Sequence, residues 1–271
     1  MKISTETKLC ISIASAPGNF GMHFHNTSYK LLNLDWIYIA RKVKNFTDLK
    51  NVINGMRALD IKGCSVSMPY KKVVMQFLDE IDDHAKKIGA VNTIKHKNNK
   101  ILKGYNTDFY GAKKALQKIN LTGKNIILIG AGGAAGAIGL AVKELGGHLT
   151  IATRDFERGK ELSKKLNAKT ITLEQVRNSS GYLLINATPV GMKNTNEVIV
   201  EKDVIKNYDA IMDIVMYPAK TKLLKLATNL GKEIIPGTLM CVHQAAEQFK
   251  IYTGIDAPEK VINNTLMELN K

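Results

Sequence analysis

Cysteine is scarce in this chain of 271 residues, which contains three cysteines, Cys10, Cys64 and Cys241. Their odd number and wide separation exclude a disulfide framework and a zinc site of the usual spacing. Such usage is typical of proteins that stay in a reducing cytosol. The first residues, MKISTETK, also lack the apolar core of a secretory signal. We therefore expect a cytoplasmic protein.

Long apolar runs are equally scarce, and the one at residues 126–142 is at the short limit for a bilayer-spanning helix. It contains five glycines, which make a weak helix centre. A glycine-rich turn between a strand and a helix of a soluble domain explains this run better than a membrane span. We expect no association with a membrane.

Acidic residues are outnumbered, because 39 Lys and Arg face 24 Asp and Glu and give a net charge of +15. The lysines are spread along the chain, and no array of interleaved aromatic and basic residues of the kind that stacks bases is present. We interpret the excess as a solvated lysine-rich surface and expect no nucleic-acid partner. The hydrophobic fraction of 45% excludes disordered and fibrous classes and suffices for one large or two ordinary domains.

Strand and helix patterns alternate along the first hundred residues, which indicates parallel α/β packing. Strands are predicted at residues 9–13, 36–40 and 61–68, and helices at 46–59 and 72–81.

The second half shows the alternation more clearly. A strand at 125–129 precedes the sequence GAGGAA at 130–135, and a helix of small residues then runs to Leu145, where Gly146 and Gly147 end it. Further strands are predicted at 149–152, 182–186, 210–215 and 233–235, and a long helix from about residue 239. We expect an N-terminal α/β domain of residues 1–106 plus 239–271, a Rossmann-type doubly wound domain of residues 107–238, and a cleft between them.

The GAGGAA turn stands where a dinucleotide-binding fingerprint requires it, between a strand and a helix. Gly130 permits the tight turn, Gly132 allows a pyrophosphate to approach the backbone, and Ala135 allows close packing of helix on strand. The helix N-terminus offers free N–H groups to phosphate. Alternatively, the glycines serve tight packing alone.

The end of the next strand distinguishes the two nicotinamide cofactors. NAD-binding proteins usually place an acid there to hold the ribose hydroxyl. This chain has Thr153, Arg154 and Asp155, and Arg158 follows one helical turn later. Because a guanidinium suits a 2′-phosphate, NADP is favoured over NAD. Asp155 leaves NAD open, since its carboxylate could hold the ribose instead.

Three loops of the first half, at residues 63–71, 89–93 and 104–108, present hydroxyls, amides, one lysine and one acid after apolar runs. Such groups suit a small hydroxylated substrate. A lysine beside a carboxylate can exchange a proton with an alcohol–ketone pair, which makes Lys71 and Asp108 candidates. Alternatively, Lys71 is an ordinary surface lysine and Asp108 a helix N-cap.

Taken together, these segments resemble the shikimate dehydrogenase family over nearly the whole chain. The family patterns N-V-T-x-P-x-K, G-A-V-N-T, G-x-N-T-D, N-x-T-x-x-G-M and G-x-x-M-x-x-x-Q-A match residues 65–71, 89–93, 104–108, 186–192 and 237–245, in that order. Several matches in the right order are more specific than any single motif.

The resemblance implies reversible hydride transfer between NADPH and 3-dehydroshikimate, giving shikimate for aromatic amino acid synthesis. Lys71 would be the general acid and base, and Asp108 would orient it. The implied substrate-binding residues are Asn19, Ser65, Ser67, Asn92, Asn106 and Gln244. The expected cofactor-binding residues are Gly130, Gly132, Gly133, Ala134, Ala135, Thr153, Arg154, Arg158, Thr188, Met192 and Gly237.

The chain departs from the family pattern on the substrate side. Two serines of the H-S-x-S-P-x-x-H-N element are replaced by Asn19 and Gly21, and the tyrosine of D-x-x-Y is Met216. The asparagine of N-V-T is Ser65. The chain therefore resembles the shikimate-dehydrogenase-like branch, and quinate or another cyclic hydroxy acid is an alternative substrate. A ligand-sensing relative without turnover is a further alternative, against which the intact Lys71 and Asp108 argue.

His23 and His25 stand two residues apart without an acid or cysteine to complete a metal site, so we expect no metal. His25 matches the family's H-N position and is expected to be structural. The expected partner is a small-molecule substrate, and the chain is expected to be a monomer or a homodimer.

Overall fold

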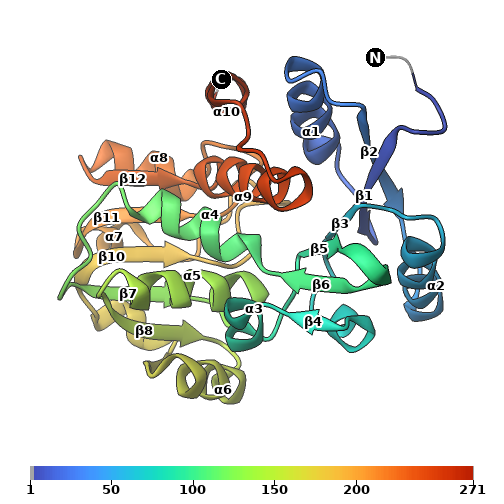
Figure 1. The fold of residues 1–271 in the computed structure, drawn as a ribbon. Coiled ribbons are helices and arrows are strands. Elements are labelled where there is room, and N and C mark those ends of the chain that lie inside the picture. Colours follow the sequence, from blue (N-terminus) through green and yellow to red (C-terminus); the bar gives the residue numbers. More distant parts are fainter. Residues whose placement is uncertain (1–2, 271) are drawn as a thin grey trace. The chain divides into compact units, whose positions relative to one another are not determined.

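The computed structural model describes residues 3–270, which form two compact units (Figure 1). The first unit contains the residues up to 107 together with 244–265. The second contains residues 108–243 and those from 266 on. The boundary at 243/244 falls inside the helix α9 (Gly237–Thr253).

The sheet of the first unit has six strands in the order β2-β1-β3-β5-β6-β4. Their bounds are β1 (Lys8–Ala14), β2 (Trp36–Lys42), β3 (Gly63–Val66), β4 (Glu80–Ile81), β5 (Thr93–His96) and β6 (Leu102–Tyr105). The predicted parallel packing holds for β1, β2 and β3. It is wrong for β5, which is antiparallel to both β3 and β6. The short turn η2 (Asn98–Lys100) joins β5 to β6, and so short a connection can join only antiparallel strands.

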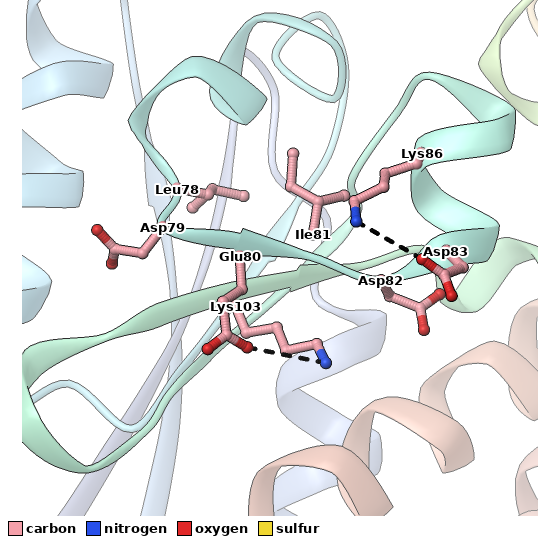
Figure 2. Close-up of a pocket in the computed structure, with 8 residues that line it drawn as sticks. All are labelled: Leu78, Asp79, Glu80, Ile81, Asp82, Asp83, Lys86 and Lys103. Carbon is pink, nitrogen blue, oxygen red and sulfur yellow. Dashed lines mark ion pairs between the residues drawn. The ribbon is translucent and has the colours of Figure 1, made fainter.

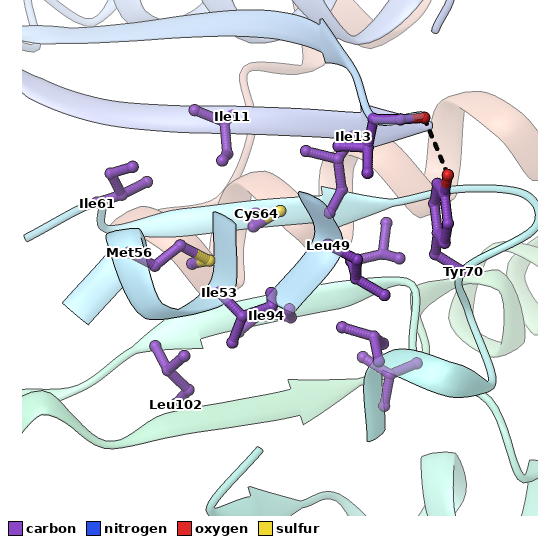
Figure 3. Packing of buried hydrophobic residues seen from close by; sticks show 14 of the residues in the cluster. Ile11, Ile13, Leu49, Ile53, Met56, Ile61, Cys64, Tyr70, Ile94 and Leu102 are labelled. Atoms are coloured by element: carbon purple, nitrogen blue, oxygen red, sulfur yellow. Dashed lines mark hydrogen bonds between the residues drawn. The ribbon is translucent and has the colours of Figure 1, made fainter. Parts of the chain in front are cut away.

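One face of this sheet packs against the helix α2 (Phe46–Ala58), close to the predicted 46–59. The helix begins where the Asn45 side chain accepts a hydrogen bond from the Asp48 N–H. Its buried side chains Leu49, Ile53 and Met56 follow helical spacing and contact Ile11, Ile13 and Cys64 of the sheet (Figure 3). The Tyr70 hydroxyl donates to the Val43 carbonyl at 2.9 Å at the edge of this core.

The opposite face is covered by α1 (Phe20–Leu31) and by the part of α9 that belongs to this unit. Its core is aromatic, with Phe24, Tyr29, Tyr38, Phe249 and Tyr252 almost fully buried. Gly63 of β3 lies directly beneath the Tyr252 ring, where a Cβ would come 2.4 Å from Cδ1.

The predicted helix at 72–81 is wrong. The segment forms a short 3₁₀ helix, η1 (Val73–Phe77), followed by β4. The chain after η1 is extended because Asp79 forms hydrogen bonds with β6. Its N–H donates to the Leu102 carbonyl at 3.0 Å, and its Oδ2 accepts from the Leu102 N–H at 2.7 Å. The helix α3 (Asp83–Ile88) follows.

The second unit is built on a six-stranded parallel sheet in the order β12-β11-β10-β7-β8-β9. The bounds are β7 (Asn125–Ile129), β8 (His148–Thr153), β9 (Lys169–Thr172), β10 (Gly181–Asn186), β11 (Tyr208–Asp213) and β12 (Glu233–Pro236). The predicted Rossmann-type domain is confirmed. The strand order reverses between β7 and β10, which is where such sheets bind ligands.

Helices cover both faces of this sheet. On one face, α5 (Gly133–Glu144) packs close to α6 (Phe156–Leu166), since a Cβ on Gly139 would come 2.6 Å from Leu166. The other face packs against η3 (Glu174–Asn178), α7 (Lys202–Ile205) and α8 (Lys222–Asn229). The remaining helices are α4 (Thr107–Leu116) and α10 (Glu259–Leu269). Among residues 3–270, none of the helices has the length and apolarity that crossing a membrane requires.

Candidate active site

The turn after β7 has the geometry that its glycines predict. Gly130 has a φ of +119°, and a Cβ there would come 3.0 Å from the Ala187 carbonyl oxygen. Gly132 caps α5, and a Cβ there would meet no atom within 4 Å. The first turn of α5, which includes Gly133, Ala134 and Ala135, contains no acid. The free N–H groups of this turn are therefore available to an anion.

A cavity of about 820 Å³ opens at this turn, within the second unit. Six of the predicted cofactor-binding residues line it: Gly130, Gly132, Thr153, Arg154, Arg158 and Thr188. The other five, Gly133, Ala134, Ala135, Met192 and Gly237, are not part of its lining. The sequence analysis missed the lining residues Ile129, Ala131, Leu173, Ala187, Pro189, Val190, Val198 and Ile199 and gave Asp155 only as an alternative. Ile129, Leu173, Val198 and Ile199 are apolar and lie outside the quoted motifs. The other four stand inside motif segments in which they were not assigned individually.

The polar end of the cavity carries two guanidinium groups and one carboxylate. Asp155 is the N-cap of α6, and its Oδ1 accepts from the Arg158 N–H at 3.1 Å. The carboxylate is thus engaged by the helix, while Arg154 and Arg158 supply positive charge. These residues, the open space at Gly132 and the acid-free helix start together fit a dinucleotide with a 2′-phosphate.

Backbone hydrogen bonds bring the three predicted polar loops together within the first unit. The Val91 N–H donates to the Lys71 carbonyl at 2.7 Å, and the Val66 N–H donates to the Asn92 carbonyl at 2.8 Å. The Asn92 N–H donates to the Tyr105 carbonyl at 3.0 Å. Residues from all three loops therefore lie side by side.

The Asn92 side chain is held by its oxygen. Asn92 Oδ1 accepts hydrogen bonds from Thr93 Oγ1 at 2.8 Å, from the Thr107 N–H at 2.7 Å and from Thr107 Oγ1 at 3.1 Å. Because its acceptor is fully used, Asn92 can offer a ligand only the donor group Nδ2.

Helix α9 completes this cluster. Gln244 Oε1 lies 3.2 Å from Thr107 Oγ1, and Gln248 Nε2 donates to Thr93 Oγ1 at 3.0 Å and to Ser65 Oγ at 3.2 Å. The sequence analysis missed Thr93, Thr107 and Gln248. The spacing of four residues between Gln244 and Gln248 places both on one helix face and was the available signal.

The other predicted substrate-binding residues differ in their surroundings. Asn106 is fully buried, and its Nδ2 donates to the Ala90 carbonyl at 2.9 Å. Ser67 donates its backbone N–H to the Ile13 carbonyl. Asn19 is exposed at the start of α1 and makes no side-chain cap. A Cβ on Gly21 would lie 3.2 Å from Tyr38 Cε1 and from Tyr38 Oη.

The two predicted catalytic residues fall on either side of the unit boundary. Lys71 is half-buried in the first unit, and Asp108 is 7% exposed at the start of the second. Since α4 begins at Thr107, Asp108 lies inside its first turn and is not its N-cap. A carboxylate in this position is stabilised by the helix dipole.

The two histidines of α1, His23 and His25, differ in solvent exposure. His25 is fully buried, while His23 is exposed. Burial lowers the pKa of His25 to about 3. Within residues 3–270, no group of three or more His, Cys, Asp or Glu side chains has the arrangement of a metal site. All three cysteines are free thiols.

A second cavity, of about 500 Å³, lies in the first unit beside β4 (Figure 2). Its carboxylates are engaged by nearby cations and backbone. Asp83 pairs with Lys86 at 3.5 Å, Glu80 pairs with Lys97 at 2.8 Å, and Asp82 caps α3. Hydrogen bonds from the Leu102 N–H and from Arg57 lower the pKa of Asp79. These groups stabilise the local fold and are distinct from the polar cluster at Asn92.

Residues 20–94 match the model of the shikimate dehydrogenase substrate binding domain, and residues 237–267 match that of the shikimate 5′-dehydrogenase C-terminal domain. A shikimate dehydrogenase (NADP(+)) of Methanococcoides burtonii is 38% identical, over 90% of this chain and 91% of the relative. The chain belongs to the shikimate dehydrogenase family.

The relatives include proteins named shikimate dehydrogenase and proteins named shikimate dehydrogenase-like. A shikimate dehydrogenase-like protein of Haemophilus influenzae is also 38% identical, over 93% of this chain and 92% of the relative. A solved shikimate 5-dehydrogenase-like protein has a TM-score of 0.90 at 35% identity and full coverage of both chains. A shikimate dehydrogenase solved in complex with NADP+ has the same TM-score and identity, covering 100% of this chain and 98% of its own.

Proposed function

We propose that this protein is an NADP-dependent oxidoreductase that interconverts 3-dehydroshikimate and shikimate. The observation that carries the proposal is the cavity at the Gly130–Gly132 turn with Arg154 and Arg158 at its polar end, in a chain of this family. Relatives that share this architecture are named shikimate dehydrogenase (NADP(+)). Bound NADPH supplies the hydride.

Within this proposal, Lys71 gives a proton to the alkoxide that forms at the substrate and takes it back in the reverse direction. Asp108 orients Lys71 and accepts a hydrogen bond from the neighbouring hydroxyl. Asn92 supports the assignment most directly, because its oxygen is occupied and it presents two N–H donors to a substrate oxygen. Asn19, Ser65, Ser67, Asn106 and Gln244 complete the proposed substrate contacts.

On the cofactor side, the Gly130–Ala135 turn and the start of α5 hold the pyrophosphate. Thr153, Arg154 and Arg158 hold the 2′-phosphate. Thr188, Met192 and Gly237 are assigned to the nicotinamide side. We propose a substrate domain of residues 1–106 plus 239–271 and a cofactor domain of residues 107–238. The two compact units differ from these bounds in that residues 239–243 and those from 266 on belong to the second unit.

A second candidate substrate is quinate or another cyclic hydroxy acid. It is favoured by Asn19 and Gly21, which stand in place of the serine pair of the family pattern. Gly21 provides no side-chain hydrogen bond, so the carboxylate of the substrate is held differently from the family pattern.

The test measures reduction of NADP+ and of NAD+ with shikimate, quinate and related acids. We expect NADP+ reduction with shikimate, and a fall in kcat of at least about a thousandfold in Lys71→Ala with little change in KM. Lys72→Ala, at the exposed neighbouring lysine, is the matched control. Turnover with quinate alone would establish the second candidate. Wild-type turnover in Lys71→Ala would remove Lys71 from the mechanism.

Two further assignments accompany the function. The free thiols support residence in the reducing cytosol. The active species is a monomer or a homodimer, which light scattering on the purified protein distinguishes.

A further inference from the structure

Asp213 is a buried carboxylate to which the proposed mechanism gives no role. It ends β11, is 1% exposed, and belongs to the D-x-x-Y pattern whose tyrosine is Met216 in this chain. Burial raises its pKa, while hydrogen bonds to its oxygens oppose that shift. A buried acid is costly unless such hydrogen bonds satisfy it.

Both oxygens of Asp213 accept hydrogen bonds. Oδ1 accepts from Asn186 Nδ2 at 3.0 Å and from the Val215 N–H at 3.2 Å, and Oδ2 accepts from Thr221 Oγ1 at 2.7 Å. Because a carboxylate accepts and does not donate, it fixes the direction of every one of these bonds.

The orientation of the Asn186 amide follows from this. Its Nδ2 faces Asp213 and also donates to the Val190 carbonyl at 3.3 Å. Its Oδ1 is therefore turned towards Thr188 and accepts from the Thr188 N–H at 3.0 Å and from Thr188 Oγ1 at 2.7 Å. All the hydrogen-bonding groups of this amide are thereby used.

Thr188 connects the Asn186 amide to the cofactor cavity, because it is hydrogen-bonded to Asn186 and lines the cavity. Residues 187–190, Thr188 among them, form part of the cavity lining, and the Ala187 carbonyl lies against Gly130 of the glycine turn. The single hydroxyl proton of Thr188 is directed to Asn186. Its oxygen accepts a hydrogen bond from the Val190 N–H at 3.3 Å, which ties Thr188 to the rest of the 187–190 segment.

We propose that Asp213 is a positioning residue, which orients the Asn186 amide so that Asn186 holds Thr188 and the 187–190 wall in the shape that receives the dinucleotide. This inference rests on the proposed function for the identity of the ligand. The chain of contacts lies entirely within the second unit.

The main experiment measures the Kd of NADPH by fluorescence titration at pH 8. Asp213→Asn keeps the shape of the side chain but allows the Asn186 amide to turn over. We expect its Kd to rise by about tenfold or more. Asp209→Asn makes the same change at an exposed position of the same strand and should stay within twofold of wild type.

Thr221→Val separates positioning from a loss of stability. It removes the hydrogen bond to Asp213 Oδ2 and the side-chain cap of α8, but it leaves the bond to Asn186 in place. Its melting temperature should fall while its NADPH Kd stays within twofold of wild type. A rise in Kd as large as that of Asp213→Asn would show that general loosening is sufficient and would overturn the proposal.

A double-mutant cycle tests the route through Thr188. In the Thr188→Val background, Asp213→Asn should raise the Kd by less than about threefold, because the group it positions is already lost. An equal factor in both backgrounds would overturn the proposal. If Asp213→Asn fails to fold, Asn186→Ala, which removes the connecting amide, should give the same rise in Kd, and an unchanged Kd would overturn the proposal.

A result against the proposed function is distinguishable from one against this inference. If the wild-type protein binds neither NADPH nor NADH, the proposed function fails. The positioning is then decided by a crystal structure of Asp213→Asn, or of Asn186→Ala if that variant alone folds. Displacement of Thr188 from its wild-type position supports the inference, and an unmoved Thr188 overturns it.

Discussion

The imidazole of His25 stacks on the ring of Tyr38, with 4.4 Å between the ring centroids and 14° between the planes. Phe24, Phe249 and Tyr252 surround it on the other sides. Burial in this aromatic core lowers the pKa of His25 to about 3, against an ordinary value of 6.5, and the Gln248 side chain opposes the shift only in part.

This burial predicts acid sensitivity of the first unit. Between about pH 6.5 and pH 3 the unfolded chain binds one proton more than the folded chain, so this group costs about 1.4 kcal/mol of stability for each pH unit of acidification. The cost is absent above the unfolded pKa and complete below the folded one. The free energy of unfolding of His25→Phe, relative to that of wild type, should therefore rise by about 2–3 kcal/mol between pH 7.5 and pH 4.5.

Urea unfolding at each pH, followed by the fluorescence of the single tryptophan, Trp36, measures this change, because Trp36 lies in the first unit together with His25. His148→Phe, at an exposed position, is the control and should follow the pH dependence of wild type. The same pH dependence in His25→Phe and wild type would contradict the assignment.

Gly132→Ala should weaken cofactor binding without weakening the fold. The added Cβ meets no protein atom within 4 Å, and the backbone φ of −83° suits any residue, but the methyl group enters the proposed pyrophosphate position. We expect the Kd of NADPH to rise by about tenfold or more at an unchanged melting temperature.

Gly130→Ala is the contrasting variant. It should lose stability as well, because of its φ of +119° and the Ala187 carbonyl 3.0 Å from the new Cβ. Wild-type affinity in Gly132→Ala would argue against a pyrophosphate at this turn.

Arg154→Ser should change cofactor preference more than activity. Loss of a charge-assisted hydrogen bond costs about 1.5–3 kcal/mol, which corresponds to a rise of roughly 10–100-fold in the Kd of NADPH. The Kd of NADH should stay within twofold, since NADH has no 2′-phosphate. Arg177→Ser, outside the cavity lining, is the control. A parallel loss of both cofactors would assign Arg154 to another part of the dinucleotide.

Gly63→Ala should destabilise the first unit. The new Cβ would lie 2.4 Å from Cδ1 and 2.5 Å from Cε1 of Tyr252, a ring that is fully buried and has no space to move. Overpacking of this kind costs about 1–3 kcal/mol. Gly55→Ala in α2, where no atom lies within 4 Å, should instead gain about 0.5–1 kcal/mol. Equal unfolding midpoints in urea for the two variants would refute this packing argument.

The double variant Asn19→Ser with Gly21→Ser restores the serine pair of the family pattern. If shikimate is the substrate, its KM should fall by about 5–10-fold, because a hydroxyl is added near its carboxylate. Tyr38 must give way slightly, since the new Cβ at position 21 would lie 3.2 Å from its hydroxyl. An unchanged KM would place the substrate carboxylate elsewhere.

Local signals were sufficient for the cofactor half of the site. The strand at 125–129, the glycine turn and the end of α5 were predicted at or within a residue of their observed positions, with α5 predicted to end at Leu145 and observed to end at Glu144. A buried parallel strand is an apolar run, and the turn needs glycine for its own backbone conformation, so a short stretch of sequence specifies each.

The sequence predictions failed where contacts with a distant segment of the chain determine the local structure. Residues 72–81 have helical spacing, yet the pairing of Asp79 with Leu102 makes part of the segment a strand. Likewise, no pattern near residue 93 indicates that Thr93 accepts a hydrogen bond from Gln248, 155 residues later in the chain.

The sequence by itself determined the α/β fold class, the dinucleotide turn and the family, because each is visible in short motifs and in the local periodicity of apolar residues. Only the tertiary structure showed that Asn92 offers a ligand donors alone and that Asp213 accepts a hydrogen bond from the Asn186 amide. The direction of a hydrogen bond depends on every other partner of the two groups, and those partners are brought together only by folding.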